Sequence, residues 1–175
     1  MKRAPIREAL ARIDLLANEI DGHIPAGKPS LAEFRSDLAG LLNVTVCATY
    51  ENCIKSIIQD YAQRQHALFG IYSENQYGRI NSRISVGDLN FYAKKFHPKI
   101  HLYFKDELRR IKSYYLNRTS EDIQDAYEQL LEWRHSFAHT GARVTTVEEV
   151  MKYHRLGKRV VLIFSDAFSS FPTSN

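Results

Sequence analysis

One stretch of the sequence gathers side chains that can bind and cleave a phosphodiester. It reads LLEWRHSFAHTG from residue 130 to residue 141 and contains Arg134 and His139. Arginine is a permanent cation, and histidine is the residue type that exchanges a proton near neutral pH. An imidazole can act as general base or acid on a ribose 2′-hydroxyl, while a guanidinium stabilises the charge that gathers on the phosphorus oxygens. Because that 2′-hydroxyl is the nucleophile, the predicted substrate is RNA and not DNA.

The same residues have a plainer interpretation. An arginine and a histidine near a helix end commonly form a salt bridge and a favourable contact with the helix dipole. Arg134 and His139 are five positions apart, so on one helix they project about 140° from each other at ~100° per residue. They converge only if the last turn is distorted or if a second copy of the helix faces the first. The spacing therefore indicates half a site, which a second chain would complete.

Two histidine pairs have a spacing that can chelate a metal. His135 and His139 share one face of a helix, and His97 and His101 flank Pro98. Pro98 is expected to begin a new helix and to leave His97 outside it. The metal-free reaction also needs fewer groups than a tetrahedral zinc site. We therefore expect no metal and no cofactor.

Glu51 is a carboxylate beside small and apolar residues in a predicted helix. It has two interpretations. In the first it is a solvated acid that pairs with Lys55 one turn later. In the second it is a buried acid that orients an arginine from another helix, since buried acids are scarce without a partner.

Two basic pairs are candidate contacts for an RNA backbone, and they are Lys94 with Lys95 and Arg109 with Arg110. Such pairs usually cover a solvated helix face, although beside a cleft they attract phosphate. The formal net charge of +4 is a modest basic excess. It permits a polyanionic partner without requiring one.

Apolar residues recur at helical spacing along the chain, which predicts an all-α bundle of five to six helices. We expect one domain over residues 1–175, with residues 169–175 as a frayed tail. The helices are expected at about 5–21, 31–67, 88–97, 99–115, 120–140 and 147–168. The second is long, and its expected inward residues include Leu41, Thr45 and Ala48. The segment 70–88 is rich in Gly, Ser and Asn and is predicted as loop, with at most a short helix around 80–84.

Three further expectations concern single residues. Asp88 can cap the helix that follows it. Gly141 suits the left-handed position that closes the penultimate helix, which carries Arg134 and His139. Gly157, with the β-branched residues after it, makes a break or a local strand possible in the last helix.

The location of the protein is predicted from what the sequence lacks. No apolar run approaches the ~20 residues that span a bilayer, and the basic N-terminus is not followed by the apolar core of a secretory signal. Cys47 and Cys53 are expected to be unpaired core residues in a reducing compartment. We therefore expect a cytoplasmic protein without a membrane partner.

The segment from Arg134 to Gly141 resembles the motif of the HEPN superfamily (higher eukaryotes and prokaryotes nucleotide-binding). That motif is an arginine, a polar residue, three further positions and a histidine, followed by a small or Gly-containing turn. The predicted layout is also similar to this superfamily, with a long early helix and the motif on the penultimate helix. The segment Ala48–Ile54 is similar to early-helix segments of RiboL-PSP-type and related bacterial HEPN proteins, in which an acidic residue lies near the motif.

The resemblance implies a metal-independent endoribonuclease, often a toxin or a phage-defence effector. It implies a homodimer in which two motifs form one composite cleft, with a cognate antitoxin or a defence protein as a further partner. It also implies that Arg134 and His139 are the catalytic pair, that His135 positions or assists them, and that Glu51 supports them. In one toxin subfamily a tyrosine two residues after the histidine is modified by a partner nucleotidyltransferase. Gly141 takes that position here, so that regulation is not implied.

Two other functions remain open. Some HEPN domains bind a nucleotide, RNA or a partner protein without cutting RNA, although an intact motif argues against this. The third possibility is a small antitoxin or another helical nucleic-acid-binding protein. It is disfavoured because the sequence has no helix-turn-helix signature and no concentrated basic stripe.

Overall fold

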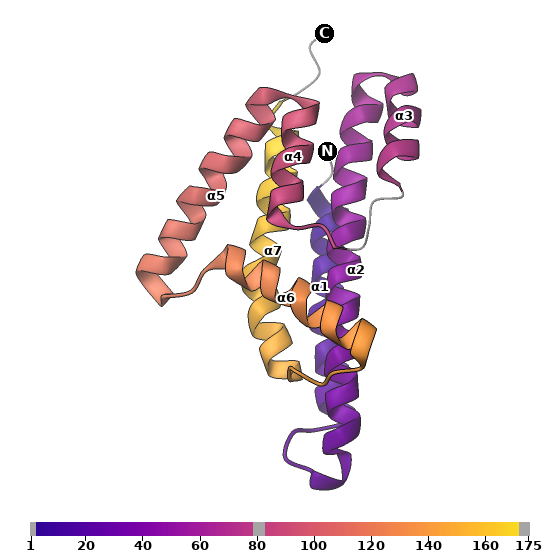
Figure 1. Cartoon of the computed structure of the whole chain (residues 1–175), viewed down its shortest axis with the longest axis vertical. Coiled ribbons are helices and arrows are strands. Elements are labelled where there is room, and N and C mark those ends of the chain that lie inside the picture. Colours follow the sequence, from indigo (N-terminus) through magenta and orange to yellow (C-terminus); the bar gives the residue numbers. More distant parts are fainter. Residues whose placement is uncertain (1–2, 79–82, 172–175) are drawn as a thin grey trace.

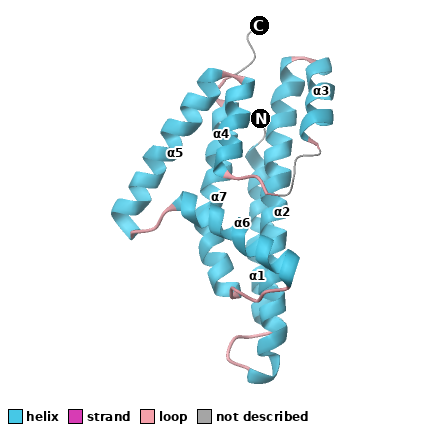
Figure 2. Cartoon of the chain, in the orientation of Figure 1, coloured by secondary structure: helices cyan, strands magenta, loops and turns pink. Residues whose placement is uncertain are grey.

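Helices make up nearly all of the structure, a computed structural model that describes residues 3–78 and 83–171 (Figures 1 and 2). Within these residues there are seven α-helices, one 3-10 turn and no strand. They are α1 (Arg3–His23), η1 (Pro29–Leu31), α2 (Ala32–Gln65), α3 (Ala67–Tyr77), α4 (Val86–Phe96), α5 (Pro98–Thr119), α6 (Ile123–Thr140) and α7 (Val147–Ser169). The predicted all-α class is confirmed, and the described part of the chain holds one helix more than the five or six expected.

The long helix α2 is the axis of the bundle. It has 34 residues, and α1 and α7 run beside it. The penultimate helix α6 crosses α2 and α7, while α4 and α5 form a hairpin on one side (Figure 1). The long second helix and the place of the motif on the penultimate helix are therefore as predicted.

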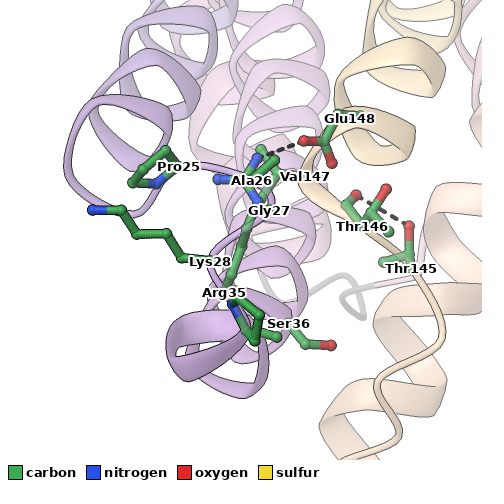
Figure 3. Close-up of a pocket in the computed structure, with 12 residues that line it drawn as sticks. Pro25, Ala26, Gly27, Lys28, Arg35, Ser36, Thr145, Thr146, Val147 and Glu148 are labelled. Carbon is green, nitrogen blue, oxygen red and sulfur yellow. Dashed lines mark hydrogen bonds and ion pairs between the residues drawn. The ribbon is translucent and has the colours of Figure 1, made fainter.

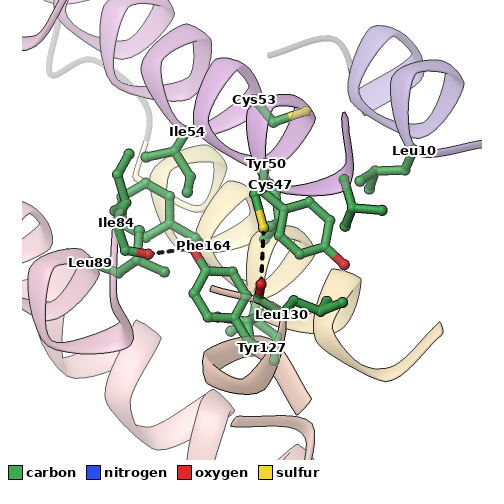
Figure 4. Close-up of a cluster of buried hydrophobic side chains, with 14 of the residues drawn as sticks. Leu10, Cys47, Tyr50, Cys53, Ile54, Ile84, Leu89, Tyr127, Leu130 and Phe164 are labelled. Carbon is green, nitrogen blue, oxygen red and sulfur yellow. Dashed lines mark hydrogen bonds between the residues drawn. The ribbon is translucent and has the colours of Figure 1, made fainter. Parts of the chain in front are cut away.

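The core lies where α2, α6 and α7 meet, and it is rich in aromatic rings (Figure 4). Tyr50 and Tyr127 are fully buried and stack with their ring centroids 5.5 Å apart. The Tyr127 hydroxyl donates to the backbone carbonyl of Ile84 at 2.6 Å, so its polar atom is satisfied. Buried aromatic side chains contribute large apolar areas, so this stack fixes how α6 lies on α2.

One histidine belongs to this core and not to the motif. His154 of α7 is fully buried, and its Nδ1 lies 3.0 Å from the Tyr50 hydroxyl. Burial, with a smaller effect of Lys158, lowers the pKa of His154 to about 4. The imidazole is therefore neutral at pH 7.

Helix α3 was not expected, because the segment 70–88 had been predicted as loop. Its N-terminus is capped by His66, whose Nδ1 accepts a hydrogen bond from the backbone N–H of Leu68. Gly70 packs so closely on α2 that a Cβ atom there would lie 1.9 Å from the Gln63 side chain. Glycine weakens an isolated helix, but Gly70 permits α3 to pack on α2. Tertiary packing therefore overrides the low helix propensity of this segment.

The residue that caps α4 also differs from the prediction. Ser85 is the N-cap, and Asp88 is its partner in a reciprocal capping box. Asp88 was therefore correctly placed at the start of this helix but in the wrong capping role. Most of the short helix expected around 80–84 falls outside the described residues.

The last helix, α7, runs through Gly157 without a break or a strand. A Cβ atom at this glycine would lie 3.2 Å from the Cα of Tyr127. Gly157 therefore permits close approach of α6 and does not interrupt α7. The helix ends at Ser169, and residues 172–175 of the predicted frayed tail lie outside the described residues.

Three residues of α2 that were expected to face inward are exposed instead, and they are Leu41, Thr45 and Ala48. They lie on one side of the helix together with the exposed Phe34. The inward face is used by their neighbours, among them Leu42 and Val46. Along the described residues no helix is both long and apolar enough to cross a membrane.

Candidate functional site

The motif occupies the C-terminal half of α6, which is a regular helix up to Thr140. Gly141 ends it in the left-handed region at φ 66°, and its N–H donates to the Phe137 carbonyl at 2.9 Å. The last turn is thus not distorted in a way that would bring Arg134 and His139 onto one stripe. The two side chains leave α6 in directions about 140° apart, as their spacing predicts.

Arg134 extends from a turn of α6 that α2 holds firmly. The Leu130 carbonyl, one turn earlier, accepts from the Cys47 thiol at 3.4 Å (Figure 4). It also accepts from Nδ2 of Asn43 at 3.0 Å. Both donors are buried. Hydrogen bonds made in a low-dielectric interior are strong, so the base of the Arg134 side chain cannot shift without breaking them.

The Arg134 guanidinium itself is half-buried, and within the described residues it makes no hydrogen bond or ion pair. Its charge acts on the Cys47 thiol, whose pKa burial raises to about 12; Arg134 opposes this rise and Glu51 adds to it. Arg134 and Glu51 are therefore both near Cys47. The salt bridge of the plainer interpretation is not formed by Arg134 within this part of the chain.

Glu51 pairs with Lys55, one turn later on the same helix. Its carboxylate receives a hydrogen bond from Lys55 Nζ at 2.6 Å. The pair is not a solvated one, because the two side chains are only 16% and 22% exposed. Glu51 is thus a largely buried acid, but its hydrogen bond goes to a lysine of its own helix and not to an arginine of another helix.

His135 and His139 lie side by side on the exposed face of α6. Their ring centroids are 4.4 Å apart with the planes tilted by 55°. Neither ring has a hydrogen bond to another described residue. His139 does lie in the last turn, where the helix dipole favours a cation. The two imidazoles are therefore open to a ligand from outside the chain.

Phe137 and Arg143 fix the end of α6 against α2. The Phe137 ring fills the space over Gly40, where a Cβ atom would lie 2.2 Å from it. Beyond Gly141, the Arg143 guanidinium donates two hydrogen bonds to the Asp37 carboxylate at 2.5 and 2.8 Å and one to Glu33 at 2.6 Å. The hydrogen bond from Arg143 lowers the pKa of Asp37. Such a forked pair holds orientation as well as charge.

The chain matches the sequence profile of the RiboL-PSP-HEPN family over residues 7–170. It belongs to this family. No match to it was found among curated proteins or among solved structures. The match covers all the helices that build the motif and its supports, from α1 to α7 of this HEPN protein.

The four basic residues expected to contact RNA do not lie beside the HEPN motif. Arg109 and Arg110 are on α5, on the opposite side of the bundle from the end of α6 (Figure 1). Both are engaged with acids on their own helix, at 3.7 Å to Asp106 and 2.6 Å to Glu107. Lys94 and Lys95 are exposed on α4, and neither forms an ion pair with a described residue.

No group of three or more His, Cys, Asp or Glu side chains in the described parts of the chain could hold a metal ion. His97 lies outside α5, as Pro98 predicted, and its Nδ1 accepts from the backbone N–H of Lys99 at 3.1 Å. This nitrogen is thus used as a helix cap.

A cavity of about 450 Å³ lies between the α1–α2 loop and the start of α7 (Figure 3). It does not include the motif. Its one buried cation, Arg35, is held by Asp21 and Glu148 at 2.6 Å each and by the Ile24 carbonyl. These partners already neutralise the guanidinium, so the cavity offers little to a phosphate. We do not assign the activity of this HEPN protein to it.

Sequence reasoning missed three residues that support the motif, namely Asn43, Asp37 and Arg143. Asn43 is a polar residue within an apolar helical run, and that is a usable signal of a buried hydrogen bond. The partners of all three lie on distant parts of the chain, at separations of 87 residues for Asn43 and 106 for Arg143. Only the fold brings them together.

Proposed function

We propose that this HEPN protein is a metal-independent endoribonuclease in which Arg134 and His139 form the catalytic pair. The observation that carries the proposal is the state of Arg134. Its backbone is anchored through the Leu130 carbonyl, while its guanidinium has no partner among the described residues. A half-buried cation without a counter-ion is unfavourable. A phosphate beside the guanidinium would supply the missing negative charge and remove this unfavourable free energy. The site should therefore bind anions.

The reaction needs no group beyond the RNA, one guanidinium and two imidazoles. His139 removes the proton from a ribose 2′-hydroxyl, and the oxygen then attacks the adjacent phosphorus. Arg134 stabilises the negative charge that builds on the non-bridging oxygens. The bond to the 5′-oxygen breaks, and that oxygen takes a proton from a second imidazole. The products are a 2′,3′-cyclic phosphate and a 5′-hydroxyl end.

We further propose that two copies of the chain form one composite cleft, because Arg134 and His139 of a single α6 point apart. The exposed stripe of Phe34, Leu41, Thr45 and Ala48 on α2 is the surface that we assign to the contact. The Thr45 hydroxyl donates to the Leu41 carbonyl of its own helix at 2.9 Å. The outer face of this threonine is then its methyl group, so the stripe is apolar along its length.

The catalytic proposal is tested with Arg134→Ala and His139→Ala, using His23→Ala as the matched control, since His23 is an exposed histidine on α1. Each motif variant should reduce RNA cleavage by about 10²- to 10⁴-fold, the usual contribution of general acid–base and electrostatic catalysis. The circular dichroism melting curve should stay unchanged. Cleavage by the parent protein should survive EDTA and leave cyclic phosphate ends. Undiminished cleavage by well-folded His139→Ala protein would falsify the assignment.

One observation favours a second candidate, a non-catalytic module that binds a nucleotide, RNA or a partner protein. A catalytic histidine is normally oriented by a third group, and His139 has no such hydrogen bond within the described residues. Under this alternative the parent protein would leave RNA intact, and a nucleotide would raise its melting temperature through linkage.

In the cell we place the reaction in the cytoplasm, as that of a toxin or phage-defence effector restrained by a cognate antitoxin or a defence partner. The unpaired Cys47 and Cys53 support a reducing compartment. The Arg134→Ala/His139→Ala double variant then tests the role as well as the chemistry. Cells should tolerate its expression better than that of the parent protein, and equal tolerance would argue against a toxic nuclease.

A further inference from the structure

A second aromatic site lies away from the motif, between α3 and α4. It is a cleft of about 470 Å³. Five rings line it, namely Phe69, Tyr72, Tyr77, Tyr92 and Phe96. The remaining lining residues are Gln76 and Lys95, an amide and a cation. Its volume is within the range of cavities that hold small organic ligands.

The cleft is more than an outer layer of the core. Phe96 does pack inward, with its ring centroid 5.5 Å from that of Phe168. Tyr72, by contrast, is 57% exposed, and its ring stacks on Phe69 at 6.4 Å with an interplanar angle of 17°. Neither the Tyr77 nor the Tyr92 hydroxyl donates a hydrogen bond to a described residue. Flat ring faces and polar atoms are thus both available to a ligand.

Lys95 of the lining, and Lys94 next to it, can contact an anionic ligand. Lys95 places its ammonium 4.4 Å from the Phe91 ring centroid, and Lys94 is exposed beside it. The acids on α3 and α4 are Glu74 and Asp88, and Asp88 is committed to the capping box. Cations that no acid neutralises, next to aromatic faces, are the combination that proteins use to hold single-stranded nucleic acid.

We infer that the α3–α4 cleft binds unstacked bases of single-stranded RNA, at a distance from the bond that is cut. The inference rests on the proposed ribonuclease function, because it assigns the cleft to the same substrate. The rings stack on the bases, and the Gln76 amide and the tyrosine hydroxyls reach the base edges. Lys94 and Lys95 contact the phosphates, which gives these two residues the role that their sequence suggested without placing them at the motif.

The geometry also sets the length of RNA that reaches both sites. The Phe137 ring of the motif helix lies over Gly40 of α2, whereas α3 packs on α2 at Gln63. Because α2 rises about 1.5 Å per residue, these two levels are about 35 Å apart. A stacked single strand rises about 3.4 Å per nucleotide. Because α3 runs back along α2 from Gln63 towards the motif, about ten nucleotides are the most that the interval requires. Shorter RNAs should be cut without help from the cleft.

The test measures binding separately from cleavage. The full-length His139→Ala protein is titrated against a fluorescent single-stranded oligoadenylate and against a duplex of equal length. Tyr72→Ala should weaken binding of the single strand by about 5- to 100-fold, the effect of losing one stacked base, while Tyr72→Phe keeps the ring and the affinity. Tyr114→Ala is the matched control, because Tyr114 is 50% exposed on α5. It should bind like the parent, and duplex binding should not respond to Tyr72.

The outcomes separate this inference from the proposed function. If Tyr72→Ala binds single strands as tightly as Tyr114→Ala does, the inference is wrong, whether or not the parent protein cleaves RNA. A change in oligomeric state with unchanged RNA affinity would instead make the cleft a protein interface and overturn the inference. If Tyr72→Ala loses RNA binding and the parent protein cuts no RNA, the result would support RNA binding by the cleft and contradict the proposed ribonuclease function.

Discussion

Two polar groups of α2 and α6 lack a partner within the described residues, and one of them belongs to Arg134. The guanidinium has no ionic partner among the described residues, and the buried Oδ1 of Asn43 has no hydrogen bond there either. Groups of this kind usually cost free energy in a folded protein. The two groups lie on helices that touch at the Leu130 carbonyl, and under the proposed function the phosphate of the RNA supplies the partner that the Arg134 guanidinium lacks.

His154 is a buried histidine with a purely structural role, and it predicts how stability depends on pH. Its pKa is lowered to about 4 by burial, against an ordinary value of 6.5. The unfolded chain therefore binds more protons than the folded chain between these values, and the free energy of unfolding should fall as pH drops from 6.5 towards 4. The loss is up to about 3 kcal/mol. Urea denaturation across this range measures it.

The control for this effect is His154→Gln, which keeps an acceptor for the Tyr50 hydroxyl but cannot be protonated. Carboxylates such as Asp37 contribute their own pH dependence in both proteins, because their pKa is lowered in the fold. The difference between the two curves therefore isolates His154. Parallel curves for parent and variant would show that this imidazole does not control acid stability.

The proposed catalytic residues were easier to find in the sequence than the residues that hold them. Arg134 and His139 are recognisable because their types and spacing carry a chemistry that can be stated. Asn43 and Arg143 act only through atoms that the fold brings to them, and no local pattern names those atoms. Glu51 is intermediate. The sequence suggested both a pair with Lys55 and a buried acid, and the structure shows features of each.

At the scale of the elements, the contact between α2 and α6 depends on one glycine. Gly40 of the long helix α2 leaves the space that the Phe137 ring of the motif helix α6 fills. Helices approach this closely only where a small residue faces a large one. The orientation of the last turn of α6, and with it of His139, follows from this contact.

Replacing Gly40 should therefore disturb the motif and the fold together. Gly40→Leu inserts a side chain where even a Cβ atom would be 2.2 Å from Phe137. The expected loss is about 1–3 kcal/mol in the free energy of unfolding, measured by urea denaturation. Gly22→Ala is the control, because nothing lies within 4 Å of its Cβ position. Its free energy of unfolding should be unchanged or raised by less than about 1 kcal/mol.

A rescue experiment identifies the cause. Adding Phe137→Ala removes the ring that the new side chain would meet, so the double variant should be less destabilised than the sum of the two single changes. Strict additivity would mean that the two residues do not compete for the same space.

Local patterns predicted most helices but not α3. Long apolar periodicity and clear end signals mark α2, α6 and α7. These helices can therefore be predicted without knowing what packs on them. Helix α3 is short, and its glycine is favourable only because it lies against α2. Gly70 meets Gln63, and Ser73 is fully buried. Its prediction would have required knowledge of the docking surface.

At the scale of the whole molecule, α2 links three features of the structure. It carries the exposed apolar stripe, it anchors the motif helix at Asn43 and Cys47, and α3 packs along its far end. A helix of 34 residues is about 50 Å long. The dimer contact, the reactive end and the aromatic cleft that we propose would therefore share one rigid support.

The proposed dimer predicts the effect of a charge on the stripe. Leu41→Asp should convert the parent dimer to a monomer, because it buries an unpaired carboxylate in an apolar contact. The monomer should lose RNA cleavage while keeping its melting curve. Leu102→Asp is the matched control, since Leu102 on α5 is 55% exposed and Leu41 is 54% exposed. Light scattering coupled to gel filtration measures the mass.

Two results would contradict this part of the proposal. One is a parent protein that is monomeric at concentrations where it cleaves RNA. The other is a Leu41→Asp monomer that remains fully active, which would mean that one chain holds a complete site despite the angle between its catalytic side chains.

The backbone of Gly141 has a consequence for how this protein could evolve. The residue is left-handed, with φ 66°, and it occupies the position where one toxin subfamily is expected to carry a modifiable tyrosine. Any residue with a Cβ atom is strained there by about 1–2 kcal/mol. Replacing Gly141 by tyrosine alone would therefore strain the end of the motif helix, whether or not the new side chain could be modified. Control by that route requires a differently shaped turn, so a lineage with this glycine would need another way to restrain the proposed activity.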